Sequence, residues 1–193
     1  MGSNNQLNYL KRLLPTLSGP VLEIGSKDYG NTSSFRDFYV TNEYIGIDLE
    51  PGKGVDKVGD LTQDCAGLPE DYFALAICCS VLEHTRKPWI MAENITKLVK
   101  TGSWLYIAVP WVWRYHPYPD DYFRFSHTGI KSLFPAFDWN DVYYATTVDG
   151  EYLEINDDSN GADNSMAIHI AVGAGFRKYL PYLEVNMLGI KTH

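Results

Sequence analysis

Val21-Leu22-Glu23-Ile24-Gly25-Ser26 is the stretch of this 193-residue chain that decides its fold. A short, mostly apolar run that ends in glycine is typical of a buried strand followed by a turn. The pattern recurs at Tyr44-Ile45-Gly46-Ile47-Asp48, where the run ends in an acid. We therefore predict two buried strands. The residues after them are candidate site residues, because ligands of parallel sheets bind outside the carboxyl ends of the strands.

Strands and helices alternate outward from these two segments. Further strands are predicted over residues 55–58, 73–79, 104–109, 142–148 and 166–172. Helices are predicted over residues 7–14, over 34–40, from Pro88 to a stop at Gly102, and over 128–134. This alternation predicts a mostly parallel sheet covered by helices on both faces. Residues 151–164 are predicted to form a loop. Residues 176–193 carry no readable motif, but their apolar side chains suggest packing, for example on a second subunit.

Composition predicts one ordinary globular domain over residues 1–193, with 45% hydrophobic and 21% charged residues. The net charge of −8 disfavours nucleic acids and anionic membranes, because their phosphates carry the same sign. The sequence contains no apolar run of about 20 residues, the length needed to span a membrane. The polar residues 1–6 lack the apolar core of a signal peptide, so we expect a cytoplasmic location. The cysteines at 65, 78 and 79 match no zinc motif, and no metal site is expected.

Three predicted strand ends carry residues that suit different parts of one nucleoside. Gly25 would let a ligand approach the backbone closely. Asp48 could accept hydrogen bonds from ribose hydroxyls. Asp60 could accept from an exocyclic amine while Leu61 packs on a flat ring. Each residue alone could equally belong to a plain turn or cap, but together the four favour a nucleoside site.

In this order, the segments resemble the class I S-adenosylmethionine-dependent methyltransferases. The run Cys79-Ser80-Val81-Leu82-Glu83-His84 is similar to the type 11 methyltransferase group, where Leu-Glu-His follows the fourth strand. The resemblance covers roughly residues 20–135. It implies an α/β, Rossmann-like seven-stranded sheet with an antiparallel last strand. It also implies S-adenosylmethionine as cofactor, bound by Glu23, Gly25, Ser26, Asp48, Leu49, Asp60, Leu61, Cys79 and Ser80.

The first loop departs from the family pattern acid-x-Gly-x-Gly-x-Gly. Lys27 and Tyr29 stand in place of the second and third glycines, and these bulky residues could narrow the loop. A nicotinamide cofactor is disfavoured, because Gly-x-Gly-x-x-Gly is absent from the sequence.

The most distinctive stretch is PWVWRYHPYPDDYFRF at residues 110–125, which follows the fifth predicted strand. Aromatic side chains at a carboxyl strand end suit a lid or substrate wall that stacks on a sugar or a ring. The alternative is a hydrophobic connection anchored by an Arg124–Asp121 pair. A similar segment occurs in type 11 relatives associated with glycan or lipid-linked sugar biosynthesis. We predict substrate contacts from Trp111, Tyr115, Tyr122 and Arg124.

His116, within this stretch, is the best candidate for a general base. The unperturbed pKa of histidine, about 6.5, suits proton removal near neutral pH. His84 is the second candidate, and it could instead hold the loop after the fourth strand. A lone histidine is more often structural than catalytic.

We therefore predict an enzyme, an S-adenosylmethionine-dependent methyltransferase acting on an oxygen or nitrogen of a small molecule. A sugar or glycan precursor is one candidate substrate. Methylation of nucleic-acid bases is disfavoured, because Cys-Ser-Val-Leu stands where such enzymes carry Asn/Asp-Pro-Pro-aromatic. The alternative is a non-catalytic binding or assembly protein of the same fold, motivated by the bulky first loop and the aromatic stretch. A homo-oligomer is left open.

Overall fold

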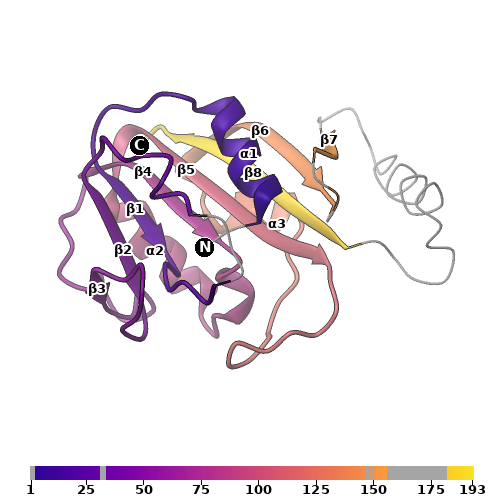
Figure 1. Cartoon of the computed structure of the whole chain (residues 1–193), viewed down its shortest axis with the longest axis horizontal. Helices are drawn as coiled ribbons and strands as arrows, with labels where there is room; N and C mark the ends of the chain where they lie inside the picture. Colours follow the sequence, from indigo (N-terminus) through magenta and orange to yellow (C-terminus); the bar gives the residue numbers. More distant parts are fainter. Residues whose placement is uncertain (1–2, 31–33, 147, 149, 156–181) are drawn as a thin grey trace, which may run out of the picture.

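The computed structural model of the chain describes residues 3–30, 34–146, 148, 150–155 and 182–193. Its centre is an eight-stranded sheet with the strand order β3-β2-β1-β4-β5-β8-β6-β7 (Figure 1). The strands are β1 (Val21–Ile24), β2 (Tyr44–Asp48), β3 (Lys57–Val58), β4 (Phe73–Cys79), β5 (Val99–Val112), β6 (Phe137–Ala145), β7 (Tyr152–Glu154) and β8 (Leu183–Lys191). The helices are α1 (Asn4–Leu13), the 3-10 turn η1 (Leu82–His84), α2 (Pro88–Leu98) and α3 (His127–Leu133).

The sheet is mostly parallel, as predicted. Strands β1 to β5 pair in parallel, with Ile24 of β1 level with Ile47 on one side and Cys78 on the other. Strand β8 is antiparallel to both of its neighbours, β5 and β6. The prediction of a Rossmann-like sheet with an antiparallel last strand is thus confirmed. The short β7 adds an eighth strand at the edge beside β6, inside the segment that was expected to be a loop.

The last strand lies in the segment that carried no readable motif. We predicted a strand over residues 166–172, which lie outside the described residues, and suggested that the tail packs on a second subunit. Instead β8 lies inside the sheet between β5 and β6. Apolar and polar residues alternate from Leu183 to Met187, which is the pattern of a half-buried strand, but the structure buries the polar residues Glu184 and Asn186 as well.

Helices cover both faces of the sheet, as expected. Ile95 of α2 and Ile130 of α3 belong to one core cluster, and Tyr9 and Leu10 of α1 to the other. Helix α1 crosses in front of β8, while α2 and α3 lie behind the sheet (Figure 1). None of the described helices combines the length and the hydropathy needed to cross a membrane.

Two of the predicted helices differ in extent or in kind. Residues 34–40 form turns instead of the predicted helix, because the segment is pinned through its aromatic side chains: Phe35 is buried and the Tyr39 hydroxyl donates to Leu14 O at 3.1 Å. Helix α2 ends at Leu98 and not near Gly102, since Val99 is already extended and begins β5.

Helix α1 is joined to the far edge of the sheet through Asn5. Its amide Nδ2 donates to the carbonyls of Thr146 and Val148 at 2.7 and 2.8 Å, and its Oδ1 accepts from Gly150 N at 2.8 Å. Asn5 is 2% exposed. One side chain therefore satisfies three backbone groups of the β6–β7 connection.

We expect Asn5→Ala to lower the free energy of unfolding by about 2–3 kcal/mol, because three hydrogen bonds of about 1 kcal/mol each are lost. Urea denaturation followed by circular dichroism would measure the change. The matched control is Asn8→Ala, an exposed position on the same helix, which should stay within about 0.5 kcal/mol of the wild type. Equal stabilities of the two variants would contradict this role of Asn5.

Candidate functional site

A cavity of about 460 Å³ lies at the carboxyl ends of β1, β2, β4 and β5. The predicted residues that line it are Gly25, Asp48, Leu49, Leu61, Cys79, Ser80 and His116. The other seven predicted residues do not line it: Glu23, Ser26, Asp60, Trp111, Tyr115, Tyr122 and Arg124. His84, the second candidate for a general base, lines it as well, and residues that line it but were not predicted as site residues include Gln6, Lys27, Glu83, Trp113, Tyr118 and Glu184. The strand ends named by the sequence thus coincide with this cavity.

The turn after β1 requires glycine at position 25. Gly25 has φ +71°, and a Cβ there would lie 2.4 Å from Cγ2 of Val81. Its amide donates to Ile47 O at 2.9 Å, which ties the turn to β2. Glu23 points away from the cavity and accepts from the Tyr44 hydroxyl at 2.8 Å, and burial raises the pKa of Glu23. The backbone of the turn, and not the Glu23 carboxylate, therefore faces the cavity.

Two bulky residues of the same turn also line the cavity. Lys27 and Tyr29, which replace the glycines of the family pattern, are both among its walls. The Lys27 ammonium pairs with Glu50 at 2.7 Å and lies over the Tyr29 ring at 5.4 Å from its centroid. The Tyr29 ring is 5.9 Å from that of Tyr118. The turn after β1 therefore meets the aromatic stretch.

Asp48 stands at the end of β2 with its carboxylate at the cavity. Its oxygens accept from the amides of Lys27 at 3.1 Å and Glu50 at 3.4 Å. A carboxylate offers about four lone-pair sites, so these two bonds leave capacity for a ligand hydroxyl. The neighbouring Leu49 is 60% exposed and lines the same wall.

The ends of β3 and β4 contribute mainly apolar surface and backbone. Leu61 is 2% exposed and lines the cavity, whereas the Asp60 carboxylate accepts from the amide and hydroxyl of Thr62 at 2.8 and 2.7 Å. Ser80 follows β4 with φ +55°. Burial raises the pKa of the Cys79 thiol beside it, so this sulfur stays protonated and unreactive.

The aromatic stretch after β5 is folded back on itself by the Arg124–Asp121 pair. Arg124 donates to both Asp121 carboxylate oxygens, at 2.5 and 2.7 Å, and to Arg114 O at 2.9 Å. Asp121 also accepts from the His116 amide at 2.8 Å. The hydrogen bonds from Arg124 hold the pKa of the Asp121 carboxyl well below its usual range. The expected anchor is therefore present, and it positions the segment that carries His116.

The predicted substrate residues take different places in this stretch. Trp111 packs against the core, while Tyr115 is 70% exposed. The Tyr122 hydroxyl donates to Asp120 at 2.5 Å and accepts from Arg86 at 2.7 Å. Trp113 and Tyr118 are the aromatic side chains of the stretch that line the cavity. Beyond Val112 the chain leaves the strand, so no periodicity in the sequence could tell these two from their neighbours.

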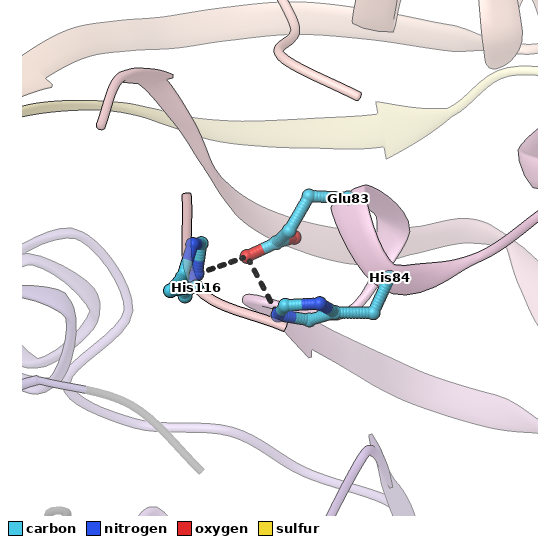
Figure 2. A group of neighbouring side chains, drawn as sticks. All are labelled: Glu83, His84 and His116. Atoms are coloured by element: carbon cyan, nitrogen blue, oxygen red, sulfur yellow. Dashed lines mark ion pairs between the residues drawn. The ribbon is translucent and has the colours of Figure 1, made fainter. Parts of the chain in front are cut away.

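Glu83, His84 and His116 gather at one side of the cavity (Figure 2). Glu83 Oε1 lies 3.7 Å from His84 Nε2 and 3.8 Å from His116 Nε2, and the two rings are 4.9 Å apart. Glu83 is fully buried, and neither carboxylate oxygen has a hydrogen-bond partner in the described residues. Burial raises the pKa of Glu83 to about 8 and lowers that of His84. The Leu-Glu-His run in the sequence drew attention to residues 82–84, but nothing in the sequence indicated that Glu83 and His84 lie beside His116.

Glu184 of β8 is a second buried carboxyl at the cavity. It is 9% exposed and accepts from Gln6 Nε2 at 3.0 Å. Burial raises the pKa of Glu184 to about 7, and the hydrogen bond from Gln6 offsets part of this effect. Below that pH the folded protein therefore holds a proton at this position.

We predict that Glu184 makes stability depend on pH. Its folded pKa lies above the unfolded value of about 4.3, so the stability it confers is complete below about pH 4.3 and is lost as the pH rises through about 7. Glu184→Gln keeps the shape and cannot titrate. Its free energy of unfolding relative to wild type should rise by about 2–4 kcal/mol between pH 4 and pH 8. Urea titrations at both pH values measure this difference, which includes the effect of the Glu184 charge on the pKa of Glu83. Parallel pH profiles would contradict the prediction.

Comparison with known proteins agrees with this geometry. A family model described as a methyltransferase domain matches residues 5–143 of the chain. A SAM-dependent methyltransferase from Archaeoglobus fulgidus has the same fold, with a TM-score of 0.59, 16% identity, and coverage of 96% of this chain and 92% of that chain. No curated protein matches the chain.

Two further solved structures share the fold. The Burkholderia thailandensis 1,6-didemethyltoxoflavin-N1-methyltransferase, with bound 1,6-didemethyltoxoflavin and S-adenosylhomocysteine, has a TM-score of 0.64 and 13% identity, and the match covers 97% of this chain and 77% of that chain. A chain in the complex of the Haloferax volcanii Trm112 methyltransferase activator and the putative methyltransferase has a TM-score of 0.62 and 15% identity. The match covers 98% of this chain and 89% of that chain. At these identities the likeness shows the fold.

Proposed function

Because the chain belongs to the methyltransferase domain family, we propose that it transfers a methyl group to an oxygen or nitrogen atom of a small molecule. The resemblance to the class I S-adenosylmethionine-dependent methyltransferases is confirmed by the family match and the fold. The observation that carries the proposal is the cavity at the carboxyl ends of four strands, with Asp48 and the backbone of Gly25 in its walls. The cytoplasmic location expected from the sequence stays a prediction.

The residues at the strand ends fit S-adenosylmethionine. A cavity of about 460 Å³ lies in the range of small-molecule sites. The free lone pairs of Asp48 suit the vicinal hydroxyls of a ribose, and Leu61 offers a flat apolar wall for a base. We propose that Gly25, Ser26 and Ser80 contribute backbone contacts, and that Asp60 contributes to the adenine side. The bound cofactor supplies an activated methyl group on a sulfonium, so the protein mainly has to align the acceptor.

We assign the acceptor side to the aromatic stretch. Trp113 and Tyr118 line the cavity, and aromatic faces of this kind stack on sugars or planar rings. Trp111, Tyr122 and Arg124 act by holding the stretch in place through core packing and hydrogen bonds, and the exposed Tyr115 is free to reach a bound acceptor. A sugar or glycan precursor remains one candidate acceptor class.

We expect Asp48→Ala to weaken S-adenosylmethionine binding by about ten- to a hundredfold, because charge-assisted hydrogen bonds of about 1.5–3 kcal/mol are lost. Isothermal calorimetry with S-adenosylmethionine and S-adenosylhomocysteine measures the effect. The control Asp37→Ala removes the same charge from an exposed position away from the cavity. An unchanged affinity of the folded Asp48→Ala variant for S-adenosylmethionine would show that Asp48 does not bind the ribose. A wild type that binds neither compound would favour the non-catalytic alternative.

We propose His116 as the group that accepts a proton from the acceptor when no metal is bound. His116→Ala should then slow the methyl-transfer step by about 10²–10⁴-fold with little change in cofactor affinity. Acceptors are first found by screening hydroxyl and amine compounds, sugars included, for release of S-adenosylhomocysteine, and the rate is then measured in single turnover. The control is His193→Ala, an exposed histidine outside the cavity. A full transfer rate in His116→Ala would end this assignment.

A further inference from the structure

The hydrogen bonds around His84 and His116 fix which ring nitrogens carry hydrogen. His84 Nδ1 lies 2.7 Å from Asp120 O, and a carbonyl oxygen can only accept, so this nitrogen is the donor. His116 Nδ1 lies 3.2 Å from Arg114 O and 3.3 Å from Asp121 Oδ2, which are also acceptors. In both neutral rings the lone pair is therefore on Nε2, the nitrogen that faces Glu83.

Three atoms that can act as metal ligands thus converge. Oε1 of Glu83 and Nε2 of the two histidines lie within 4.8 Å of one another. The Glu83 carboxylate is fully buried and has no hydrogen-bond partner in the described residues. A buried carboxylate without a donor is costly unless a cation compensates its charge or a proton neutralises it. The spacings of 3.7 and 3.8 Å are too long for direct hydrogen bonds.

The same spacings leave room for a metal ion. Bonds of about 2.0–2.2 Å to imidazole nitrogen and carboxylate oxygen place neighbouring ligand atoms ~3.0–3.6 Å apart. The two pairs of Glu83 with a histidine therefore have to close by only about a few tenths of an ångström, and the two histidine Nε2 atoms lie within 4.8 Å of each other. Metal-bound histidines nearly always donate their other ring N–H to a carbonyl or carboxylate. Both histidines already do so, which holds the rings in the orientation that a metal requires.

We propose that Glu83, His84 and His116 bind a divalent first-row transition metal ion at the wall of the cavity. Two imidazoles and one carboxylate suit zinc, iron, cobalt or manganese, whereas magnesium and calcium prefer all-oxygen sites. Three protein ligands leave coordination positions open. Because all three residues line the cavity, those positions face the acceptor side, and an acceptor with hydroxyl or carboxylate oxygens would complete the coordination. This departs from the sequence, in which we expected no metal site.

The metal site changes the role of His116 but does not depend on methyl transfer. His116 Nε2 cannot hold a metal and accept a proton at the same time. In the metal-loaded protein the ion activates a coordinated hydroxyl by lowering its pKa, and His116 acts as a ligand. A chelator would then lower the rate of transfer by the loaded protein to that of the metal-free protein, in which His116 is free to accept the proton, whereas it would leave the rate of an enzyme that never binds metal unchanged.

The test is metal binding by the full-length, untagged chain after removal of metals with a chelator. We expect one Co²⁺ or Zn²⁺ per chain by mass spectrometry of the metal content, visible absorption bands for Co²⁺, and competition between the two ions. Glu83→Gln and His116→Gln should each weaken binding by at least about a hundredfold, since loss of mere outer contacts already costs about 10–100-fold. His193→Ala is the control for adventitious binding by a surface histidine and should bind as the wild type does.

Several results would overturn the proposal. These are no saturable binding by the wild type, equal binding by wild type and both site variants, or binding of Mg²⁺ and Ca²⁺ as tight as that of Zn²⁺. His116 lies on a partly exposed segment, so His116→Gln should fold even if Glu83→Gln does not, and circular dichroism establishes this. Because no cofactor or acceptor is present, failure here leaves the methyl-transfer proposal untouched.

Discussion

The ion pair between Asp121 and Arg124 is the interaction on which the acceptor side of the cavity depends. The Arg124 guanidinium donates hydrogen bonds to both Asp121 carboxylate oxygens and to the carbonyl of Arg114. The same carboxylate accepts a hydrogen bond from the amide of His116. A planar fork is suited to such a bidentate arrangement, which lysine cannot reproduce. The Asp121 side chain is 1% exposed, so removal of Arg124 would leave a buried, unpaired charge. The long segment after β5 therefore has one strongly preferred shape, and this shape brings His116 to Glu83.

The prediction of the fold succeeded for the strands that are apolar throughout and missed β8, which carries buried polar residues. Strands β1, β2 and β4 are short hydrophobic runs, and their alternation with helices is sufficient to fix a parallel sheet. Strand β8 was missed although Leu183 to Met187 alternate apolar and polar residues, and the alternation does not indicate that the polar residues Glu184 and Asn186 are buried. Their partners lie far away in the chain: Gln6 donates to Glu184, and the Tyr106 hydroxyl donates to Asn186. No local pattern reports a polar group that is satisfied by a residue of another element.

The site was predictable to the extent that topology alone determines it. The carboxyl ends of neighbouring parallel strands lie at one edge of the sheet. Gly25, Asp48 and Leu61 therefore lie close together, whichever way their side chains point. Side-chain direction is a different matter. Asp60 turns back to cap its own turn, and Tyr115 points to solvent while Trp113, two residues earlier, lines the cavity. Such choices depend on the hydrogen bonds of an irregular segment, which spacing in the sequence does not encode.

The cluster of Glu83, His84 and His116 links the two halves of the site. Glu83 and His84 belong to η1, directly after β4 on the cofactor side, whereas His116 belongs to the acceptor side (Figure 2). The backbone joins them as well, because the amides of Tyr122 and Phe123 donate to Glu83 O at 2.8 and 3.2 Å. Methyl transfer gains most from alignment of donor and acceptor. A group that bonds both halves at once sets that alignment, and a cation between the three side chains would make it rigid while also compensating the buried charge of Glu83. The same cation would then both compensate the charge of Glu83 and fix the position of the acceptor relative to the methyl donor.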